Sequence, residues 1–206
     1  MFDETMTRII FSVIFYSIFL FGAYHRHSAH RQNDRFERMK NEGPVTFMVL
    51  RTLGLVLWLT YFMFPVFPDL FAPVRFHTGS AVQWTGICLA VLALPMGISV
   101  FRNLGKNITD TVQTRTDHQL VTTGIYRFIR HPLYSTGFML FFGLGLLSGI
   151  WPALVLSLIV LFTLYLRSFE EERRLVAEFG ERYIAYRERT GAFFPIFIHF
   201  PGRDRQ

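Results

Sequence analysis

Long uncharged stretches separated by short basic segments dominate the hydrophobic pattern of this 206-residue chain. The first three uncharged runs cover residues 9–24, 52–67 and 80–101. Each is near the roughly 20 residues that an α-helix needs to cross the apolar core of a bilayer. We therefore predict transmembrane helices over residues about 8–25, 46–66 and 80–101. Pro95 lies inside the third helix and predicts a kink or break there, because proline removes a backbone donor.

A fourth uncharged run, residues 133–166, is too long for one ordinary span and fits two helices. Glycine and proline lie together near its middle, between Ser148 and Pro152, and these residues favour a turn. The run therefore predicts a tight hairpin of two helices, over residues about 133–148 and 151–167. Small residues would let the two helices approach closely, namely Gly143, Gly145 and Gly149.

Apolar positions at near-helical spacing continue beyond the hairpin, from Phe169 to Tyr186. We therefore predict that the last span extends into a polar C-terminal helix. The chain is then an all-α, multi-pass integral membrane protein. It has about five transmembrane helices, including the tight C-terminal hairpin, plus a C-terminal helix at the cytoplasmic surface.

The basic residues give an orientation for these five spans. They gather in segments 25–44 and 102–131 and in the tail from residue 167, which a five-span topology places on one side. The opposite side holds only Arg75, with Arg8 near the start of the chain. Because positive charge is enriched in cytoplasmic segments, we predict a cytoplasmic C-terminus and active site and an N-terminus outside.

Composition narrows the classes of function. The net charge of +6 arises between apolar runs and not along one polar face, so we expect membrane lipid as a neighbour and no nucleic acid. A single cysteine excludes an intrachain disulfide and a zinc site of several cysteines. The sequence contains neither an HExxH motif, which would indicate a metal site, nor a GxGxxG motif, which would indicate a Rossmann cofactor domain. Nothing in the pattern indicates an oligomeric state.

Polar residues that could carry chemistry fall in three stretches after residue 101, which read HQLVTTGIY (118–126), RHPLY (130–134) and RSFEEERRLVAEFGERYIAY (167–186). Taken singly, each has a structural interpretation: a turn, an interfacial anchor and a solvated helix face. Taken together on one side of a membrane, they could bind a zwitterionic ligand with an aromatic group. Apolar helices beside such a pocket would admit a second, lipid-like ligand.

The order of these pieces resembles the isoprenylcysteine carboxyl methyltransferase family and the related phospholipid methyltransferases. The likeness covers about residues 100–195. It runs from Leu104-Gly105 through HQLVTTGIYRFIRHPLYSTG and a glycine-containing hairpin to Arg167, Glu171-Glu172 and Phe193-Phe194-Pro195. The resemblance implies an integral membrane enzyme that uses S-adenosylmethionine without a Rossmann fold. It also divides the chain into N-terminal transmembrane helices (1–101) and a methyltransferase-like region (102–206).

The resemblance also implies roles for individual residues. Arg167 would be the catalytic residue that faces the methyl acceptor, and Glu171 would contact the cofactor from the last helix. The other cofactor-binding residues would be His118, Gln119, Leu120, Val121, Tyr126, His131, Pro132, Leu133 and Tyr134. A protonated amine acceptor would also need a base, for which Glu172 or a tyrosine is a candidate.

The lipophilic acceptor stays open among a prenylcysteine-like carboxylate, a phospholipid amine and a small hydrophobic thiol or phenol. Arg167 favours an anionic acceptor, because arginine suits carboxylate recognition. Ala192 stands where the family commonly has a basic residue, which bears on acceptor recognition. Two other classes remain as alternatives: an NADPH-dependent membrane reductase of similar architecture, and a non-enzymatic membrane protein with a degenerate site.

Overall fold

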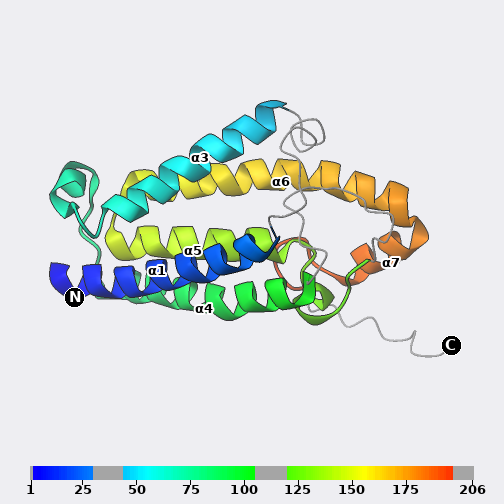
Figure 1. Cartoon of the computed structure of the whole chain (residues 1–206), viewed down its shortest axis with the longest axis horizontal. Coiled ribbons are helices and arrows are strands. Elements are labelled where there is room, and N and C mark those ends of the chain that lie inside the picture. Colours follow the sequence, from blue (N-terminus) through cyan, green and yellow to red (C-terminus); the bar gives the residue numbers. More distant parts are fainter. Residues whose placement is uncertain (1, 30–43, 105–119, 197–206) are drawn as a thin grey trace.

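The computed structural model describes residues 2–29, 44–104 and 120–196, and within these ranges the chain is helical with no β-strand. Its helices are α1 (Glu4–Ala29), α3 (Pro44–Met63), α4 (Ser80–Leu104), α5 (Pro132–Ser148), α6 (Trp151–Phe179) and α7 (Glu181–Arg189), with short 3-10 turns η2 (Pro68–Val74) and η4 (Gly124–Arg127). The long helices lie roughly side by side, and α7 folds back at one end (Figure 1). The fold is therefore the all-α membrane bundle that the hydrophobic runs predict.

Four of these helices are long and apolar enough to cross a membrane: α1, α3, α4 and α6. Helix α5 has 17 residues and spans about 26 Å, slightly less than the roughly 30 Å apolar core of a bilayer. The predicted count of five spans is therefore approximate. Pro95 lies within an unbroken α4, so the chain does not break there.

The hairpin of α5 and α6 forms where the sequence predicts it. Helix α5 ends at Gly149, which adopts the left-handed conformation (φ 72°) that glycine reaches without steric cost. Gly145 faces Leu154 of α6 closely, as predicted for the hairpin. Gly143 instead faces α4: a Cβ there would lie 2.7 Å from the carbonyl oxygen of Gly86. Gly145 thus allows α6 to approach α5 closely, and Gly143 allows α4 to approach α5 closely.

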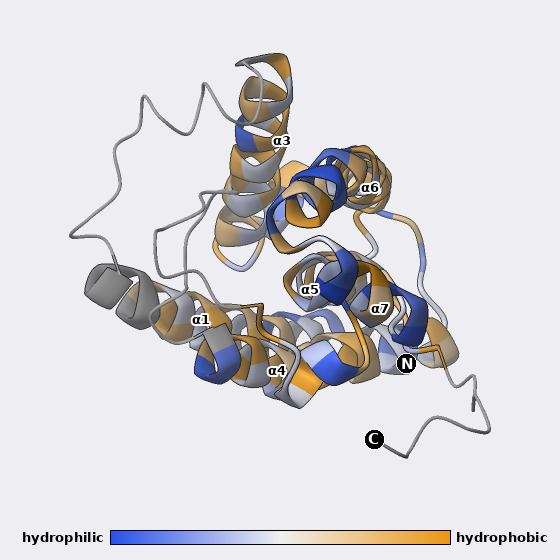
Figure 2. Cartoon of the chain, turned by 90° about the vertical axis from the view of Figure 1, so that its right-hand side faces the viewer, coloured by the Kyte–Doolittle hydropathy of each residue, from blue (hydrophilic) through white to orange (hydrophobic). Residues whose placement is uncertain are grey.

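An apolar core with several aromatic side chains joins α1, α3, α4 and α5. Its fully buried side chains include Phe11, Phe15, Tyr61 and Phe64. The hydroxyl of Tyr61 donates a 2.6 Å hydrogen bond to the carbonyl oxygen of Phe141 in α5. Many apolar side chains of the spans are exposed, which suits a lipid environment. Figure 2 shows that hydrophobic residues make up most of the length of these helices.

At the end of α5 near the hairpin turn, Arg75 ties three segments together. Its guanidinium lies 2.7 Å from Oε1 of Glu4 and donates to the carbonyl oxygen of Ser148 at 3.1 Å. The backbone N–H of Phe76 donates to the carbonyl oxygen of Gly149. These contacts fix the start of α1 against the α5–α6 turn, at the opposite end of α5 from the polar cluster described next.

Candidate functional site

The RHPLY segment forms the start of α5. His131 precedes the helix with non-helical backbone angles, and Pro132 occupies its first turn. Proline is well tolerated there because its missing N–H would have no helical partner. Tyr134 and Ser135 follow in the first turn of α5. The side chains of His131, Tyr134 and Ser135 therefore all lie at the N-terminal end of this helix. Helix α5 thus begins at Pro132, one residue before the start that the sequence predicts.

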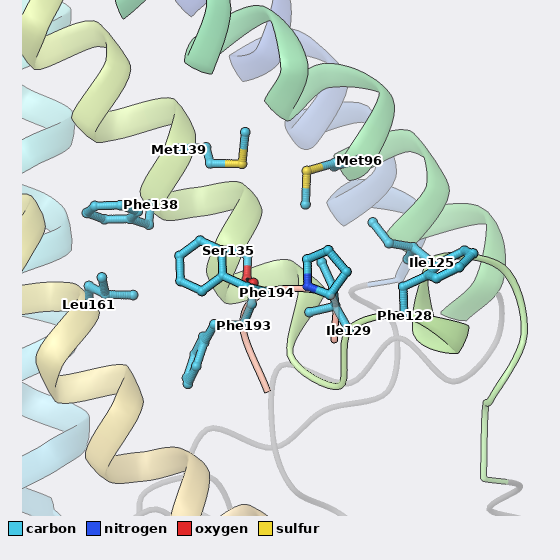
Figure 3. A pocket seen from close by; sticks show the side chains of 11 residues that line it. Met96, Ile125, Phe128, Ile129, Ser135, Phe138, Met139, Leu161, Phe193 and Phe194 are labelled. Carbon is cyan, nitrogen blue, oxygen red and sulfur yellow. Dashed lines mark hydrogen bonds between the residues drawn. The ribbon is translucent and has the colours of Figure 1, made fainter. Parts of the chain in front are cut away.

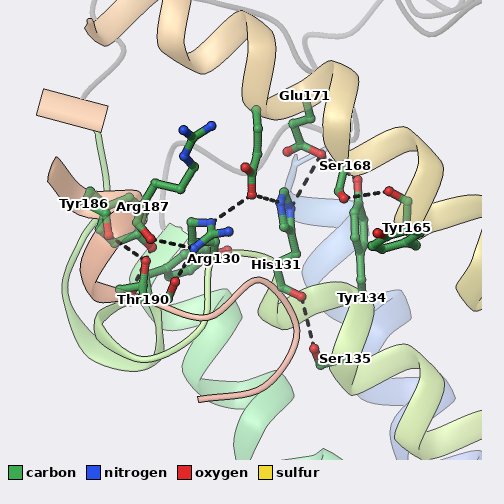
Figure 4. A network of polar contacts seen from close by, with 12 residues as sticks. Arg130, His131, Tyr134, Ser135, Tyr165, Ser168, Glu171, Tyr186, Arg187 and Thr190 are labelled. Atoms are coloured by element: carbon green, nitrogen blue, oxygen red, sulfur yellow. Dashed lines mark hydrogen bonds and ion pairs between the residues drawn. The ribbon is translucent and has the colours of Figure 1, made fainter. Parts of the chain in front are cut away.

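Arg130 points into the protein and joins α6 to α7 (Figure 4). Its Nε donates a 2.8 Å hydrogen bond to Oε1 of Glu172 in α6. Its Nη1 donates to the carbonyl oxygens of Arg187 and Thr190 at the end of α7. Only 11% of the Arg130 side chain and 14% of that of Glu172 are exposed, so water screens this pair weakly.

The buried His131 lies between the two neighbouring carboxylates of α6. Its Nε2 lies 3.2 Å from Oε1 of Glu172, and its Nδ1 lies 3.8 Å from Oε2 of Glu171. A carboxylate accepts hydrogen bonds, so the shorter contact requires a proton on Nε2. Glu172 thus receives contacts from both Arg130 and His131, which fix its orientation.

Glu171 has a different set of contacts. The hydroxyl of Tyr134 donates a 2.7 Å hydrogen bond to Oε2 of Glu171, and the guanidinium carbon of Arg167 lies 5.9 Å from the centre of the Tyr134 ring. Arg167 and Glu171 thus both lie against Tyr134, as their spacing of one helical turn predicts. Within the described ranges, no set of three His, Cys, Asp or Glu side chains is arranged to hold a metal ion. We interpret the carboxylates as partners of cations and hydroxyls.

Residues 190–193, which we call the C-terminal strap, run beside the segment before α5. The backbone N–H groups of Arg130 and His131 donate to the carbonyl oxygens of Gly191 and Ala192 at 2.8 and 2.9 Å. The hydroxyl of Ser135 donates to the carbonyl oxygen of Phe193 at 2.7 Å. The centre of the Phe193 ring then lies 5.6 Å from that of the His131 ring, and the two ring planes are inclined by 28°. The strap therefore closes one side of the polar cluster.

Three tyrosines surround the cluster on the α7 side. Burial raises the pKa of the Tyr126 hydroxyl, and the charges of Tyr186 and Glu171 raise it further. Burial also raises the pKa of Tyr183, and it raises that of Tyr186 to about 12. All three are protonated at neutral pH and cannot accept a proton. Among the candidate bases, these pKa directions favour Glu172 over Tyr126, Tyr183 and Tyr186.

The structure brings His131, Pro132, Tyr134, Arg167 and Glu171 together, and Tyr126 is near enough for the Glu171 charge to act on its pKa. Other predicted residues lie at the edge of the cluster or outside the described ranges. The side chain of Leu133 is 47% exposed, Val121 is half-buried, and Leu120 lines a separate hollow of about 350 Å³ beside α7. His118 and Gln119 lie outside the described residues.

The sequence does not predict Arg130 and Phe193 as members of the cluster, and it predicts Glu172 only as a base for an amine acceptor. Arginine before a membrane helix ordinarily indicates a lipid-facing anchor, and one of several neighbouring glutamates indicates a solvated face. The sequence signal for their shared location is the order of Arg130-His131, Glu171-Glu172 and Phe193-Phe194-Pro195 along the chain. Oppositely charged residues that are buried need one another as partners, which favours contact between the first two pairs.

Comparisons with known proteins agree on a family. The family model for phospholipid methyltransferase matches residues 81–182. The protein-S-isoprenylcysteine O-methyltransferase of Schizosaccharomyces pombe is 37% identical over 57% of this chain and 51% of its own length. The cobalt-zinc-cadmium resistance protein CzcN of Cupriavidus metallidurans is 29% identical over 59% of this chain and 58% of its own. The chain thus spans about half the length of the curated relatives it matches.

A solved structure has the same fold. The eukaryotic intramembrane Ras methyltransferase ICMT (isoprenylcysteine carboxyl methyltransferase) aligns with a TM-score of 0.52 at 22% identity, over 76% of this chain and 54% of that one. The family match at residues 81–182 includes α5 and the carboxylates of α6, which build the polar cluster. The chain therefore belongs to the membrane methyltransferase family of the isoprenylcysteine carboxyl methyltransferases and phospholipid methyltransferases.

Proposed function

We propose that this protein transfers a methyl group from S-adenosylmethionine to a lipophilic acceptor at the membrane–cytoplasm interface. The observation that carries the proposal is the joining of His131, Tyr134, Glu171 and Arg167 at the point where the apolar spans give way to polar helix. A water-soluble donor and a membrane-dissolved acceptor can meet only at such a boundary. Two of the three named relatives are methyltransferases, which supports the same reaction class.

The chemistry of the cluster fits a zwitterionic donor. Glu171 is a carboxylate at the edge of the cluster that can bind an ammonium group, and the rings of His131 and Tyr134, stacked with centroids 5.3 Å apart, would give an adenine aromatic neighbours. The full proposed donor set is His118, Gln119, Leu120, Val121, Tyr126, His131, Pro132, Leu133, Tyr134 and Glu171. Residues 102–206 would form the donor-binding region, and residues 1–101 would supply most of the membrane anchor.

When bound, the donor supplies a sulfonium-activated methyl group, so the chain's main task is to orient both ligands and exclude water. Arg167, one turn before Glu171 on α6, would hold an anionic acceptor group near Tyr134. The strap, with the ring of Phe193 on that of His131, would keep water from one side. An acceptor carboxylate or thiolate needs no base. For an amine, Glu172 would be the group to take its proton, with Arg130 and His131 holding that carboxylate in place.

Calorimetric titration of the detergent-solubilised protein with S-adenosylhomocysteine tests the proposal directly. We expect binding to the wild type and about tenfold weaker binding to Glu171→Gln, the loss of one charge-assisted contact. Glu170→Gln is the matched control, because Glu170 forms exposed pairs with Arg173 and Arg174 and should leave affinity unchanged. No binding to folded wild type, with NADPH raising the melting temperature instead, would favour a reductase and overturn the proposal. Response to neither ligand would favour a non-enzymatic role.

The proposed orientation has a separate test. A cysteine placed at Arg174 should react with a membrane-impermeant thiol reagent only from the cytoplasmic side, after Cys88 has been replaced by alanine. A cysteine placed at His77, in the segment before α4, should react only from outside. The reverse pattern would overturn the orientation and leave the proposed reaction untouched.

A further inference from the structure

Tyr183 of α7 is the one tyrosine of the described ranges whose buried hydroxyl has no hydrogen-bond partner. Only 1% of this residue is exposed. The other two buried tyrosines show the usual arrangement, since Tyr61 donates to the carbonyl oxygen of Phe141 and Tyr186 to that of Tyr126. A buried polar group that makes no hydrogen bond is costly and therefore rare in folded proteins. The Tyr183 hydroxyl thus calls for a partner that is not a group of the described protein.

The Tyr183 hydroxyl has the charged groups of the polar cluster as its electrostatic neighbours. Burial raises the pKa of Tyr183, the charge of Glu172 raises it further, and the charges of Arg130 and Glu171 also act on it. Arg130 fixes α7 beside these groups, because it donates to two carbonyl oxygens at the end of that helix. Since the raised pKa keeps the hydroxyl protonated at neutral pH, Tyr183 can offer a hydrogen bond to an acceptor beside the carboxylates of α6.

The proposed methyl donor brings such an acceptor with it. S-adenosylmethionine ends in an amino acid, whose ammonium and carboxylate are attached to the same carbon. If Glu171 binds the ammonium, the carboxylate must lie next to Glu171, and there it needs hydrogen-bond donors to replace water. The other polar donors near the carboxylates already contact groups of the protein, namely Arg130, His131, Tyr134 and Ser135. Tyr183 is the buried donor that is not yet engaged.

The two hollows near the cluster offer the carboxylate no better place. The apolar cavity of about 430 Å³ between α4, α5, α6 and the strap (Figure 3) has Ser135 as the single hydroxyl among the described side chains that line it, and this hydroxyl donates to Phe193. The hollow of about 350 Å³ beside α7 contains Arg182 and Arg189, but Glu171 is not among the described residues that line it. Neither hollow therefore provides a hydrogen-bond donor beside Glu171.

We infer that Tyr183 is a further binding residue for the methyl donor, and that its hydroxyl donates a hydrogen bond to the donor's carboxylate. The inference rests on the proposed methyl transfer, since it adds a residue to that reaction's donor site. Glu171 of α6 and Tyr183 of α7 then hold the two charged groups of one amino acid. Gly180 joins these helices in a conformation that favours glycine (φ 54°, ψ −132°), so this turn sets the spacing of the two contacts.

Paired calorimetric titrations with S-adenosylmethionine and its decarboxylated analogue test this contact, because the analogue lacks only the carboxylate. Tyr183→Phe removes only the hydroxyl, and it should weaken binding of S-adenosylmethionine about tenfold and binding of the analogue by less than about twofold. Glu171→Gln should weaken both, because both ligands carry the ammonium. Tyr61→Phe is the matched control, since it removes a buried hydroxyl from the apolar core, and it should leave both affinities unchanged.

Thermal unfolding without ligand gives a second measurement. Tyr61→Phe loses a hydrogen bond that the protein makes, so its melting temperature should fall by roughly 2–4 °C. Tyr183→Phe loses none, and it should melt at or above the temperature of the wild type. If Tyr183→Phe melts as early as Tyr61→Phe or does not fold, the hydroxyl serves the fold, and the inference is overturned.

The titrations also separate this inference from the proposed reaction. If the wild type binds both ligands and Tyr183→Phe changes neither affinity, Tyr183 is not a binding residue, and the proposed reaction stands. Equal weakening of both ligands in Tyr183→Phe would overturn the contact with the carboxylate. If the folded wild type binds neither ligand, the proposed reaction is wrong, and the role of Tyr183 falls with it.

Discussion

The two ends of α5 each carry an arginine–glutamate contact, yet the two contacts differ in almost every physical respect. At the hairpin end, Arg75 meets Glu4 at 2.7 Å, and 53% of the Glu4 side chain is exposed. At the other end, Arg130 meets Glu172 at 2.8 Å, and 14% of the Glu172 side chain is exposed. Nearly equal distances therefore accompany very different surroundings.

The partners beyond each pair explain the difference. Glu172 shares its oxygen with His131 and follows Glu171 along α6, so its end of α5 gathers several titratable groups. Among the described residues, Arg75 is the one salt-bridge partner of Glu4. Arg75 also donates to the backbone carbonyl oxygen of Ser148. Burying the charges of Arg130 and Glu172 carries a desolvation penalty. A contact that only fastens two segments, such as that of Arg75 with Glu4, does not need this burial. This is why we place the chemistry at the Arg130 end and a fastening role at the Arg75 end.

The largest expected effect comes from a change between the two ends of α5, where the helix packs against α4. In Gly143→Ala, the new Cβ would lie 2.7 Å from the carbonyl oxygen of Gly86 and 2.9 Å from the amide of Ala90. Backbone atoms yield little, so we expect about 3 kcal/mol of destabilisation and a melting temperature lowered by roughly 6–12 °C. Gly54→Ala, where a Cβ meets open space, is the matched control and should not lower it. Equal melting temperatures for both variants would contradict the close approach of α4 and α5.

The second effect concerns the Arg130 end alone. Glu172→Gln removes the charge that Arg130 and His131 share, and we expect a loss of about 2 kcal/mol, typical of hydrogen bonds to charged groups. The melting temperature should fall by roughly 4–8 °C. Glu170→Gln should change it by much less, since its pairs are exposed. A fall no larger than that of the control would show that Glu172 is not a buried partner.

The third effect concerns Arg167, whose proposed role differs from that of Arg130 in the same cluster. Arg167→Ala should lower methyl transfer to a membrane extract by about tenfold, or 1.4 kcal/mol, because the acceptor loses its charged partner. The affinity for S-adenosylhomocysteine should stay within about twofold of the wild type. Initial rates with a radiolabelled methyl donor, beside the titration, measure both quantities. An equal loss in affinity and in rate would assign Arg167 to the donor.

The smallest effect belongs to the hairpin end. Glu4→Gln should cost less than about 1 kcal/mol, because exposed ion pairs contribute little. The difference in melting temperature between Glu4→Gln and the wild type should shrink further at high salt, because screening weakens the ion pair in the wild type. A loss as large as that of Glu172→Gln would abolish the distinction between the two ends of α5.

The hydrophobic pattern was sufficient for the long helices and for the turn at Gly149, but it missed the break at Gly180, where the predicted continuous C-terminal helix divides into α6 and α7. It could not say which neighbour each glycine serves, because a glycine shows where close approach is allowed and not which helix approaches. Gly143 facing α4 is such a case. Helical spacing likewise predicts that Arg167 and Glu171 share a face, and both indeed contact Tyr134.

The pairing of Arg130 with Glu172 lay beyond sequence reasoning for a different reason. Neighbouring carboxylates differ by about 100° around a helix, and the tertiary packing of α6 on α5 decides which one meets a given partner. The strap is a second example, since its backbone hydrogen bonds to Arg130 and His131 leave no trace in side-chain pattern. The residue roles given by family resemblance therefore stay proposals that the variants above are designed to test.

The length of α6 links the site to the thickness of the surrounding membrane. Its 29 residues span about 44 Å, whereas the apolar core of a bilayer is roughly 30 Å thick. The last turns, with Glu171 and Glu172, are thus carried on a rigid extension of a spanning helix. A thicker or thinner bilayer changes the tilt of such a helix. We therefore expect lipid composition to change how far the carboxylates of α6 stand from the apolar core of the bilayer.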